Sequence, residues 1–142
     1  MELLSEMPRI FWAGDSTVKQ NDFTSYPQCG IGQGFSLFVK KEIIIVNRAE
    51  NGRSTKSFID EGRLEFIKEN IRKGDFLFIQ FGHNDEKNDP LRYTDPQTTF
   101  KENLRTFIDI ARNAGAYPLL ITPLYRRLFA EEGKLVDNTH LT

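Results

Sequence analysis

Residues 76–85 read Phe76-Leu77-Phe78-Ile79-Gln80-Phe81-Gly82-His83-Asn84-Asp85, an apolar run that ends in a polar box. The apolar run has the length of a buried strand, and the glycine marks its end. Two further runs of this kind, 9–13 and 43–47, are also followed by polar, glycine-containing boxes. A fourth run, 119–122, stops at a proline. The sequence therefore predicts four strands.

Helical patterns lie between these predicted strands. A short helix is expected at 34–39, and a second helical segment opens at Ser54 or Thr55 as its cap and continues to about residue 71. Apolar residues at helical spacing predict a third helix over 100–111, which 113–115 ends. Alternation of strands and helices favours a parallel sheet with helices on both faces, the α/β class.

Composition narrows the function classes. Twenty acidic residues against 19 basic ones give a net charge of −1, which argues against nucleic acid as a partner. A single cysteine excludes an intrachain disulfide framework and the Cys-rich zinc sites. No apolar run approaches the ~20 residues that cross a bilayer, and residues 1–8 do not resemble a signal peptide. We therefore expect a cytoplasmic protein without a membrane partner, and its oligomeric state stays open.

The 142 residues correspond to a single domain. After the fourth predicted strand the chain is polar and stops, whereas a doubly wound sheet usually continues into a fifth strand and a closing helix. We therefore expect residues 1–142 to be about the N-terminal two-thirds of the domain, with incompletely covered apolar surface at the fourth strand.

The boxes that follow the first three strands suggest acyl transfer. Ligands of open α/β sheets bind outside the carboxyl ends of the strands, so these boxes are expected to form one site. Ser16 lies in a strand-to-helix turn that exposes its hydroxyl as a nucleophile. The backbone N–H groups of Ser16 and Gly52 and the side-chain amide of Asn84 are candidate donors to a developing oxyanion.

These residues resemble blocks I, II and III of the SGNH (GDSL) hydrolases. The matching boxes are 14–17, with the sequence Gly-Asp-Ser-Thr, Gly52, and 82–85, with the sequence Gly-His-Asn-Asp. Residues 26–34 and 47–54 resemble the rhamnogalacturonan acetylesterase-like branch. The resemblance implies a flavodoxin-like three-layer αβα fold and an esterase that deacetylates carbohydrate, such as a pectin fragment. It implies Ser16 as nucleophile and an oxyanion hole of Ser16, Gly52 and Asn84, with no cofactor and no metal.

The family also has an Asp-x-x-His box, in which the histidine is the general base and the aspartate orients it. Asp137 and His140 match the Asp-x-x-His pattern. They follow the fourth predicted strand closely, whereas the box of the family follows a fifth strand and a further helix. Either these two residues form the dyad or the base lies beyond residue 142, and we favour the second. His83 is expected to have a structural role.

The alternative function is a catalytically incomplete flavodoxin-like fragment or a carbohydrate-binding protein that lacks the general base. A variant of this alternative has a Mg²⁺ ion held by Asp15, Asn84 and Asp85. The glycines of 30–34 lack the spacing of a phosphate-binding loop, so a nucleotide is not expected.

Overall fold

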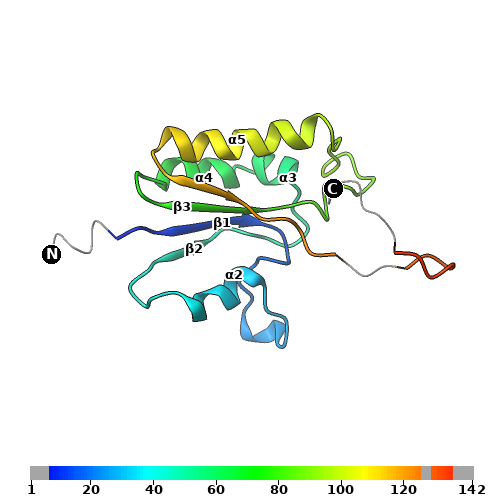
Figure 1. The fold of residues 1–142 in the computed structure, drawn as a ribbon, viewed down its shortest axis with the longest axis horizontal. Coiled ribbons are helices and arrows are strands. Elements are labelled where there is room, and N and C mark those ends of the chain that lie inside the picture. Colours follow the sequence, from blue (N-terminus) through cyan, green and yellow to red (C-terminus); the bar gives the residue numbers. More distant parts are fainter. Residues whose placement is uncertain (1–6, 126–128, 136–142) are drawn as a thin grey trace.

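Four parallel strands form one sheet in the computed structural model, which describes residues 7–125 and 129–135 (Figure 1). The strand order is β2-β1-β3-β4. The strands are β1 (Ile10–Gly14), β2 (Ile45–Asn47), β3 (Phe76–Gln80) and β4 (Tyr117–Leu120). The chain passes from β1 to β2 on one side of it and then to β3 on its other side. The strand order therefore reverses at β1, and open α/β sheets bind their ligands at such a point.

The central position of β1 explains its sequence. All five residues of β1 are buried, and Ile10 is paired with Ile45 of β2 on one side and Phe76 of β3 on the other. A strand covered on both faces needs a continuous apolar run rather than an alternating one. The prediction that Trp12 belongs to the core is confirmed, since its side chain is 1% exposed.

Three helices cover one face of the sheet (Figure 1). They are α3 (Thr55–Asp60), α4 (Arg63–Asn70) and α5 (Thr99–Asn113). Ser54 caps α3, because its hydroxyl accepts the N–H of Ser57, as the sequence predicts. Gly62, with a φ of +74°, separates α3 from α4, so the helical segment expected over this region is two helices. Phe58 of α3 and Phe107 of α5 contact each other in the core beneath.

A thinner layer covers the other face near β1 and β2 (Figure 1). It contains α2 (Ile31–Gly34) and two short 3₁₀ helices, η1 (Phe23–Ser25) and η2 (Phe35–Phe38). The helix predicted at 34–39 is thus an α-helical turn that starts earlier and continues as a 3₁₀ helix. Phe35 anchors this layer, because its ring packs edge-on against Trp12 at 5.7 Å and Phe78 at 5.5 Å between centroids.

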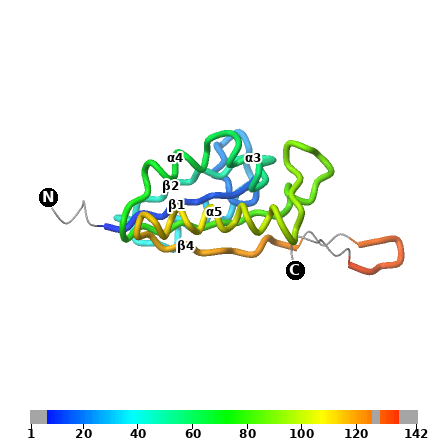
Figure 2. Tube along the Cα trace, turned by 90° about the horizontal axis from the view of Figure 1, so that it is seen from above, coloured from blue at the N-terminus to red at the C-terminus, as the bar shows by residue number. Residues whose placement is uncertain are grey.

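The β4 strand lies at the edge of the sheet beside α5, as Figure 2 shows from above. It begins two residues earlier than the sequence predicts and includes Pro118, which is tolerated because its nitrogen faces away from β3. Tyr117, Leu119 and Leu120 are 58%, 38% and 54% exposed. The expected uncovered apolar surface at the fourth strand is therefore present. Within the described ranges, no helix is long and apolar enough to cross a membrane.

Candidate active site

A tight turn follows β1 and presents Ser16. The backbone carbonyl of Asp15 accepts the N–H of Val18 at 3.0 Å. The Asp15 carboxylate closes the same turn, accepting the backbone N–H of Thr17 at 2.8 Å and its hydroxyl at 2.7 Å. Asp15 and Val18 are buried, whereas Ser16 between them is exposed. The turn therefore holds Ser16 at the carboxyl end of the central strand with its side chain open to solvent.

The glycine-containing segment 30–34 packs closely against this turn. The N–H of Ile31 donates to the carbonyl of Thr17 at 2.7 Å. A Cβ on Gly30 would lie 2.2 Å from the carbonyl oxygen of Lys19, and a Cβ on Gly32 would lie 2.7 Å from that of Val18. Two backbones thus approach more closely than any side chain allows. The alternation of glycines was the only sequence signal for this packing role.

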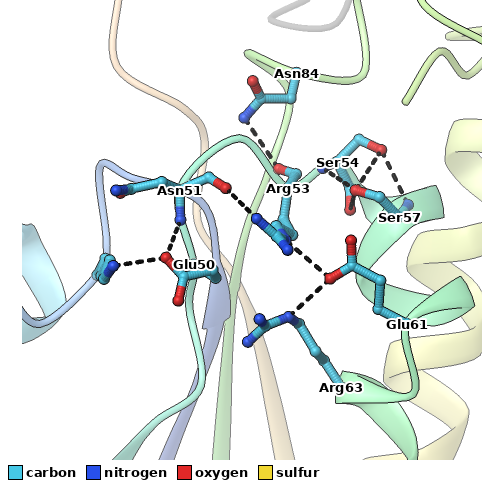
Figure 3. Close-up of polar contacts among 9 residues, drawn as sticks. Glu50, Asn51, Arg53, Ser54, Ser57, Glu61, Arg63 and Asn84 are labelled. Carbon is cyan, nitrogen blue, oxygen red and sulfur yellow. Dashed lines mark hydrogen bonds and ion pairs between the residues drawn. The ribbon is translucent and has the colours of Figure 1, made fainter. Parts of the chain in front are cut away.

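The loop after β2 lies against the same turn. The N–H of Glu50 donates to the carbonyl of Gly14 at 3.2 Å, and the Glu50 carboxylate accepts the Lys19 ammonium at 2.6 Å and the N–H of Asn51 at 2.8 Å (Figure 3). Burial raises the pKa of Glu50, but these hydrogen bonds and the charges of Lys19 and Arg63 outweigh it and hold the pKa below its ordinary value. An ionised Glu50 therefore joins the two loops.

Asn84 joins the loop after β3 to the loop after β2. Its side chain is buried, and the Nδ2 amide donates to the backbone carbonyl of Arg53 at 3.0 Å (Figure 3). An amide has two N–H groups, and among the described residues the structure gives a partner to one of them, so the second is available to another acceptor. Gly52, the residue before Arg53, has a φ of +73°, a conformation that favours glycine. Ser16, Gly52 and Asn84 thus lie on three loops at one end of the sheet.

An open pocket of about 280 Å³ lies at this end of the sheet. Ser16 and Thr17 line it from the turn after β1, and Asn51 lines it from the loop after β2. The segment between β1 and α2 contributes Asn21, Gln28 and Cys29. The pocket therefore places Ser16 in a concave surface that a small ligand can enter.

Asp85 has a role that the sequence did not reveal. Its fully buried carboxylate accepts the backbone N–H and the hydroxyl of Thr55, the first residue of α3, and the hydroxyl of Thr94. The Thr55 hydroxyl in turn accepts the side-chain amide of Asn103 in α5 at 3.1 Å. Asp85 therefore fixes the loop that carries Asn84 to both helices.

The geometry does not favour the Mg²⁺ variant. The Asp15 and Asp85 carboxylates already accept hydrogen bonds from Thr17, Thr55 and Thr94. Within residues 7–125 and 129–135, no group of three or more His, Cys, Asp or Glu side chains is placed to hold a metal ion.

His83 is buried beneath the site. Its Nε2 lies 2.6 Å from the carbonyl oxygen of Leu124, which can only accept, so Nε2 carries the proton. Its Nδ1 lies 3.9 Å from the Asp15 carboxylate. These contacts fit the structural role expected from the sequence. Asp137 and His140, the candidate dyad, lie outside the described residues.

The chain resembles two curated proteins of Bacillus subtilis strain 168 over most of its own length. It is 44% identical over 127 residues to the rhamnogalacturonan acetylesterase RhgT, covering 89% of this chain and 53% of RhgT. It is 50% identical over 118 residues to the probable rhamnogalacturonan acetylesterase YesY, covering 82% of this chain and 54% of YesY. The chain is a homologue of rhamnogalacturonan acetylesterases. It spans about half the length of these relatives.

Solved structures share the fold. The crystal structure of YxiM from B. subtilis matches with a TM-score of 0.78 and 30% identity, over 94% of this chain and 39% of that one. A lipolytic protein of the G-D-S-L family from Veillonella parvula matches with a TM-score of 0.56 and 19% identity, over 79% of this chain and 56% of that one. No family model matches the chain. The three-layer α/β fold of the SGNH (GDSL) hydrolases, predicted from the sequence, is confirmed.

Proposed function

We propose that this chain carries the nucleophile and the oxyanion hole of a serine esterase that removes O-acetyl groups from a pectin or rhamnogalacturonan-type oligosaccharide. The observation that carries the proposal is the position of Ser16, Gly52 and Asn84 on three loops at one end of the sheet, linked through Glu50 and the carbonyl of Arg53. The names of the curated relatives support the substrate class.

The proposed reaction begins when the Ser16 hydroxyl oxygen attacks the acetyl carbonyl carbon and gives its proton to a general base. The carbonyl oxygen becomes an oxyanion, which accepts hydrogen bonds from the N–H groups of Ser16 and Gly52 and from the second N–H of Asn84. The base returns the proton to the departing sugar oxygen, and water then hydrolyses the acetyl-enzyme. Asn84 needs no reorientation, because its first N–H is already held by Arg53.

The presence or absence of a general base distinguishes the esterase from the alternative function. The chain has two histidines. Of these, His140 lies outside the described residues, and the protonated Nε2 of His83 is bound to Leu124 rather than to Ser16. This contact argues against His83 as the general base, and the choice between an esterase and the alternative, a carbohydrate-binding protein without a general base, passes to His140 and to the measurement below.

Labelling by a fluorophosphonate, which modifies activated serines, tests the proposal. If residues 1–142 contain a working base, the intact mass of the chain should rise by one phosphonyl group, with no increase in Ser16→Ala. Ser36→Ala is the matched control, since Ser36 is exposed on η2 and should label like the parent chain. Asn84→Ala should slow labelling by ~10²–10³, the usual effect of losing one oxyanion donor.

The outcomes separate the two functions. Labelling that persists in Ser16→Ala would refute the assignment of the nucleophile. If the folded chain shows no labelling in any variant, the alternative without a base is supported for residues 1–142. Labelling confined to chains with Ser16 would place a working base within these residues and make Asp137 and His140 the leading dyad.

A further inference from the structure

Arg53 contacts both of the proposed oxyanion donors that lie outside the Ser16 turn. Its backbone carbonyl accepts the Nδ2 amide of Asn84 at 3.0 Å (Figure 3). Its side chain turns back onto its own loop, where Nη1 donates to the carbonyl oxygen of Asn51 at 2.8 Å (Figure 3). That carbonyl and the N–H of Gly52 belong to the same peptide unit. Arg53 therefore holds the side chain of one donor and the peptide unit of the other.

The peptide unit between Asn51 and Gly52 is the centre of a β-turn. The N–H of Arg53 donates to the carbonyl of Glu50 at 3.4 Å, which closes the turn over residues 50–53. Gly52 has a φ of +73°, and a positive φ at the third position of a turn is typical of type II. A type I turn with the same ends differs mainly by a rotation of the central peptide, which reverses its C=O and N–H groups. The ends of the turn alone therefore do not fix the direction of the Gly52 N–H.

The Arg53 guanidinium fixes this direction. A trans peptide is planar, so its C=O and N–H groups point to opposite sides. Because Nη1 of Arg53 holds the Asn51 carbonyl, the Gly52 N–H points away from the guanidinium, and it has no acceptor among the described residues. A hydrogen bond from a charged donor also polarises the peptide and strengthens its N–H as a donor. The contact thus orients the Gly52 N–H and makes it a better donor to an oxyanion.

Glu61 holds the Arg53 side chain in place. Nε of Arg53 donates to the Glu61 carboxylate at 2.9 Å, and Arg63 donates to the same oxygen at 3.1 Å (Figure 3). Burial raises the pKa of Glu61, but these hydrogen bonds and the charges of the two arginines outweigh it and hold the pKa below its ordinary value. The main chain is held as well, because Ser54, directly after Arg53, is buried and caps α3.

We propose that Arg53 is a positioning residue, whose guanidinium sets the direction of the Gly52 N–H toward the oxyanion of the proposed reaction. The role needs no contact between Arg53 and the reacting atoms. It suits a planar guanidinium, because Nε and Nη1 bind Glu61 and Asn51 at the same time. The inference rests on the proposed function, since the ester carbonyl supplies the oxyanion that the Gly52 N–H binds.

Nuclear magnetic resonance of the isotope-labelled chain tests the orientation without using the reaction. In a type II turn the Asn51 Hα lies close to the Gly52 N–H, and rotation of the peptide separates them. We expect a strong nuclear Overhauser effect between these two protons in the parent chain and a weak one in Arg53→Met, which keeps an unbranched side chain without donors. Arg53→Lys should give an intermediate effect, and it carries the test if Arg53→Met does not fold.

Arg63→Met is the matched control, since Arg63 donates to Glu61 but not to Asn51. It should keep the strong Overhauser effect of the parent chain. Its labelling by the fluorophosphonate should stay within about twofold of the parent rate, because a partly exposed ion pair contributes little.

Fluorophosphonate labelling measures the consequence for the reaction. In Arg53→Met we expect the maximal rate at saturating probe to fall about ten- to hundredfold, less than for complete loss of a donor, with the half-saturating probe concentration unchanged. Arg53→Lys should fall by a smaller factor, because its ammonium can reach Glu61 or the Asn51 carbonyl but lacks the fork that binds both.

The outcomes separate this role from other roles of Arg53. An unchanged Overhauser effect between Asn51 and Gly52 in both Arg53 variants would overturn the inference. Equal slowing in Arg63→Met and Arg53→Met would replace it by a general effect of the ion cluster. A higher half-saturating concentration at an unchanged maximal rate would assign Arg53 to ligand binding instead. Absence of labelling from every variant would contradict the proposed reaction for residues 1–142, while the resonance measurement still decides whether Arg53 orients Gly52.

Discussion

Asp85→Asn should destabilise the whole fold, although Asp85 belongs to the box that follows a strand and carries a candidate catalytic amide. The carboxylate is fully buried and accepts hydrogen bonds from the backbone N–H and hydroxyl of Thr55 and from the hydroxyl of Thr94. Asparagine keeps one oxygen but turns an NH₂ group toward at least one of these donors. Hydrogen bonds to charged groups contribute about 1.5–3 kcal/mol each, and an unpaired buried donor costs about 1–3 kcal/mol. We therefore expect the free energy of unfolding to fall by about 3–5 kcal/mol.

Urea unfolding followed by far-ultraviolet circular dichroism measures this change, with an unchanged m-value showing that the same surface is exposed on unfolding. Asp60→Asn is the control, because Asp60 forms an exposed pair with Lys56 and should change stability by less than about 0.5 kcal/mol. A loss below about 1 kcal/mol in Asp85→Asn would refute the view that this carboxylate joins the loop to the helices.

Three further predictions concern the loops and the sheet edge. Gly32→Ala should lower the free energy of unfolding by about 1–3 kcal/mol in urea and slow fluorophosphonate labelling, because the new Cβ would lie 2.7 Å from the Val18 carbonyl oxygen in the turn that presents Ser16. Unchanged labelling would contradict the supporting role of the glycines. The depressed pKa of Glu50 means that its ionised form stabilises the fold at pH above 4.5, and that this contribution is lost as pH falls below 4.5 toward the lowered value. Glu50→Gln should therefore have a flatter stability–pH curve on the acid side in urea unfolding, and a parallel curve would count against the Lys19 contact. Leu120→Lys should reduce self-association in sedimentation velocity, because Leu120 is 54% exposed on the edge strand; an unchanged sedimentation profile would show that this edge does not mediate association.

The sequence was sufficient for the architecture because each strand of the sheet has its own local signal. The run before Ser16 is apolar, which indicates a buried strand, and all five residues of β1 are buried. The run 43–47 is apolar on both faces and suggested a strand covered on both sides, but β2 is an edge strand whose residues are only partly buried. The third predicted helix, 100–111, is α5 (Thr99–Asn113) to within two residues, because its apolar residues keep a helical period over four turns. The start of β4 was missed, because Pro118 argues against a strand unless the strand is known to lie at an edge.

Contacts between distant loops were beyond sequence reasoning. Asp85 and Thr55 are 30 positions apart, and neither hydrophobic period nor turn chemistry relates them. The same holds for Asn84 and the Arg53 carbonyl, which are 31 positions apart. The strand-end rule predicted that the three boxes gather at one end of the sheet, but not which atoms hold them there. The roles of Ser16, Gly52 and Asn84 stay predictions until the labelling is measured.

The loop between Asp85 and Thr94 has ends that are hydrogen-bonded to each other. The N–H of Thr94 donates to the carbonyl of Asp85 at 3.0 Å, and the two side chains are hydrogen-bonded across the same point. Lengthening a surface loop whose ends are already fixed costs little free energy. We therefore expect that residues 86–93 can be replaced by a loop of another length and sequence without moving Asn84, which precedes the hydrogen-bonded loop ends. The sequence of this loop can then be redesigned or transplanted separately from the proposed chemistry at Ser16.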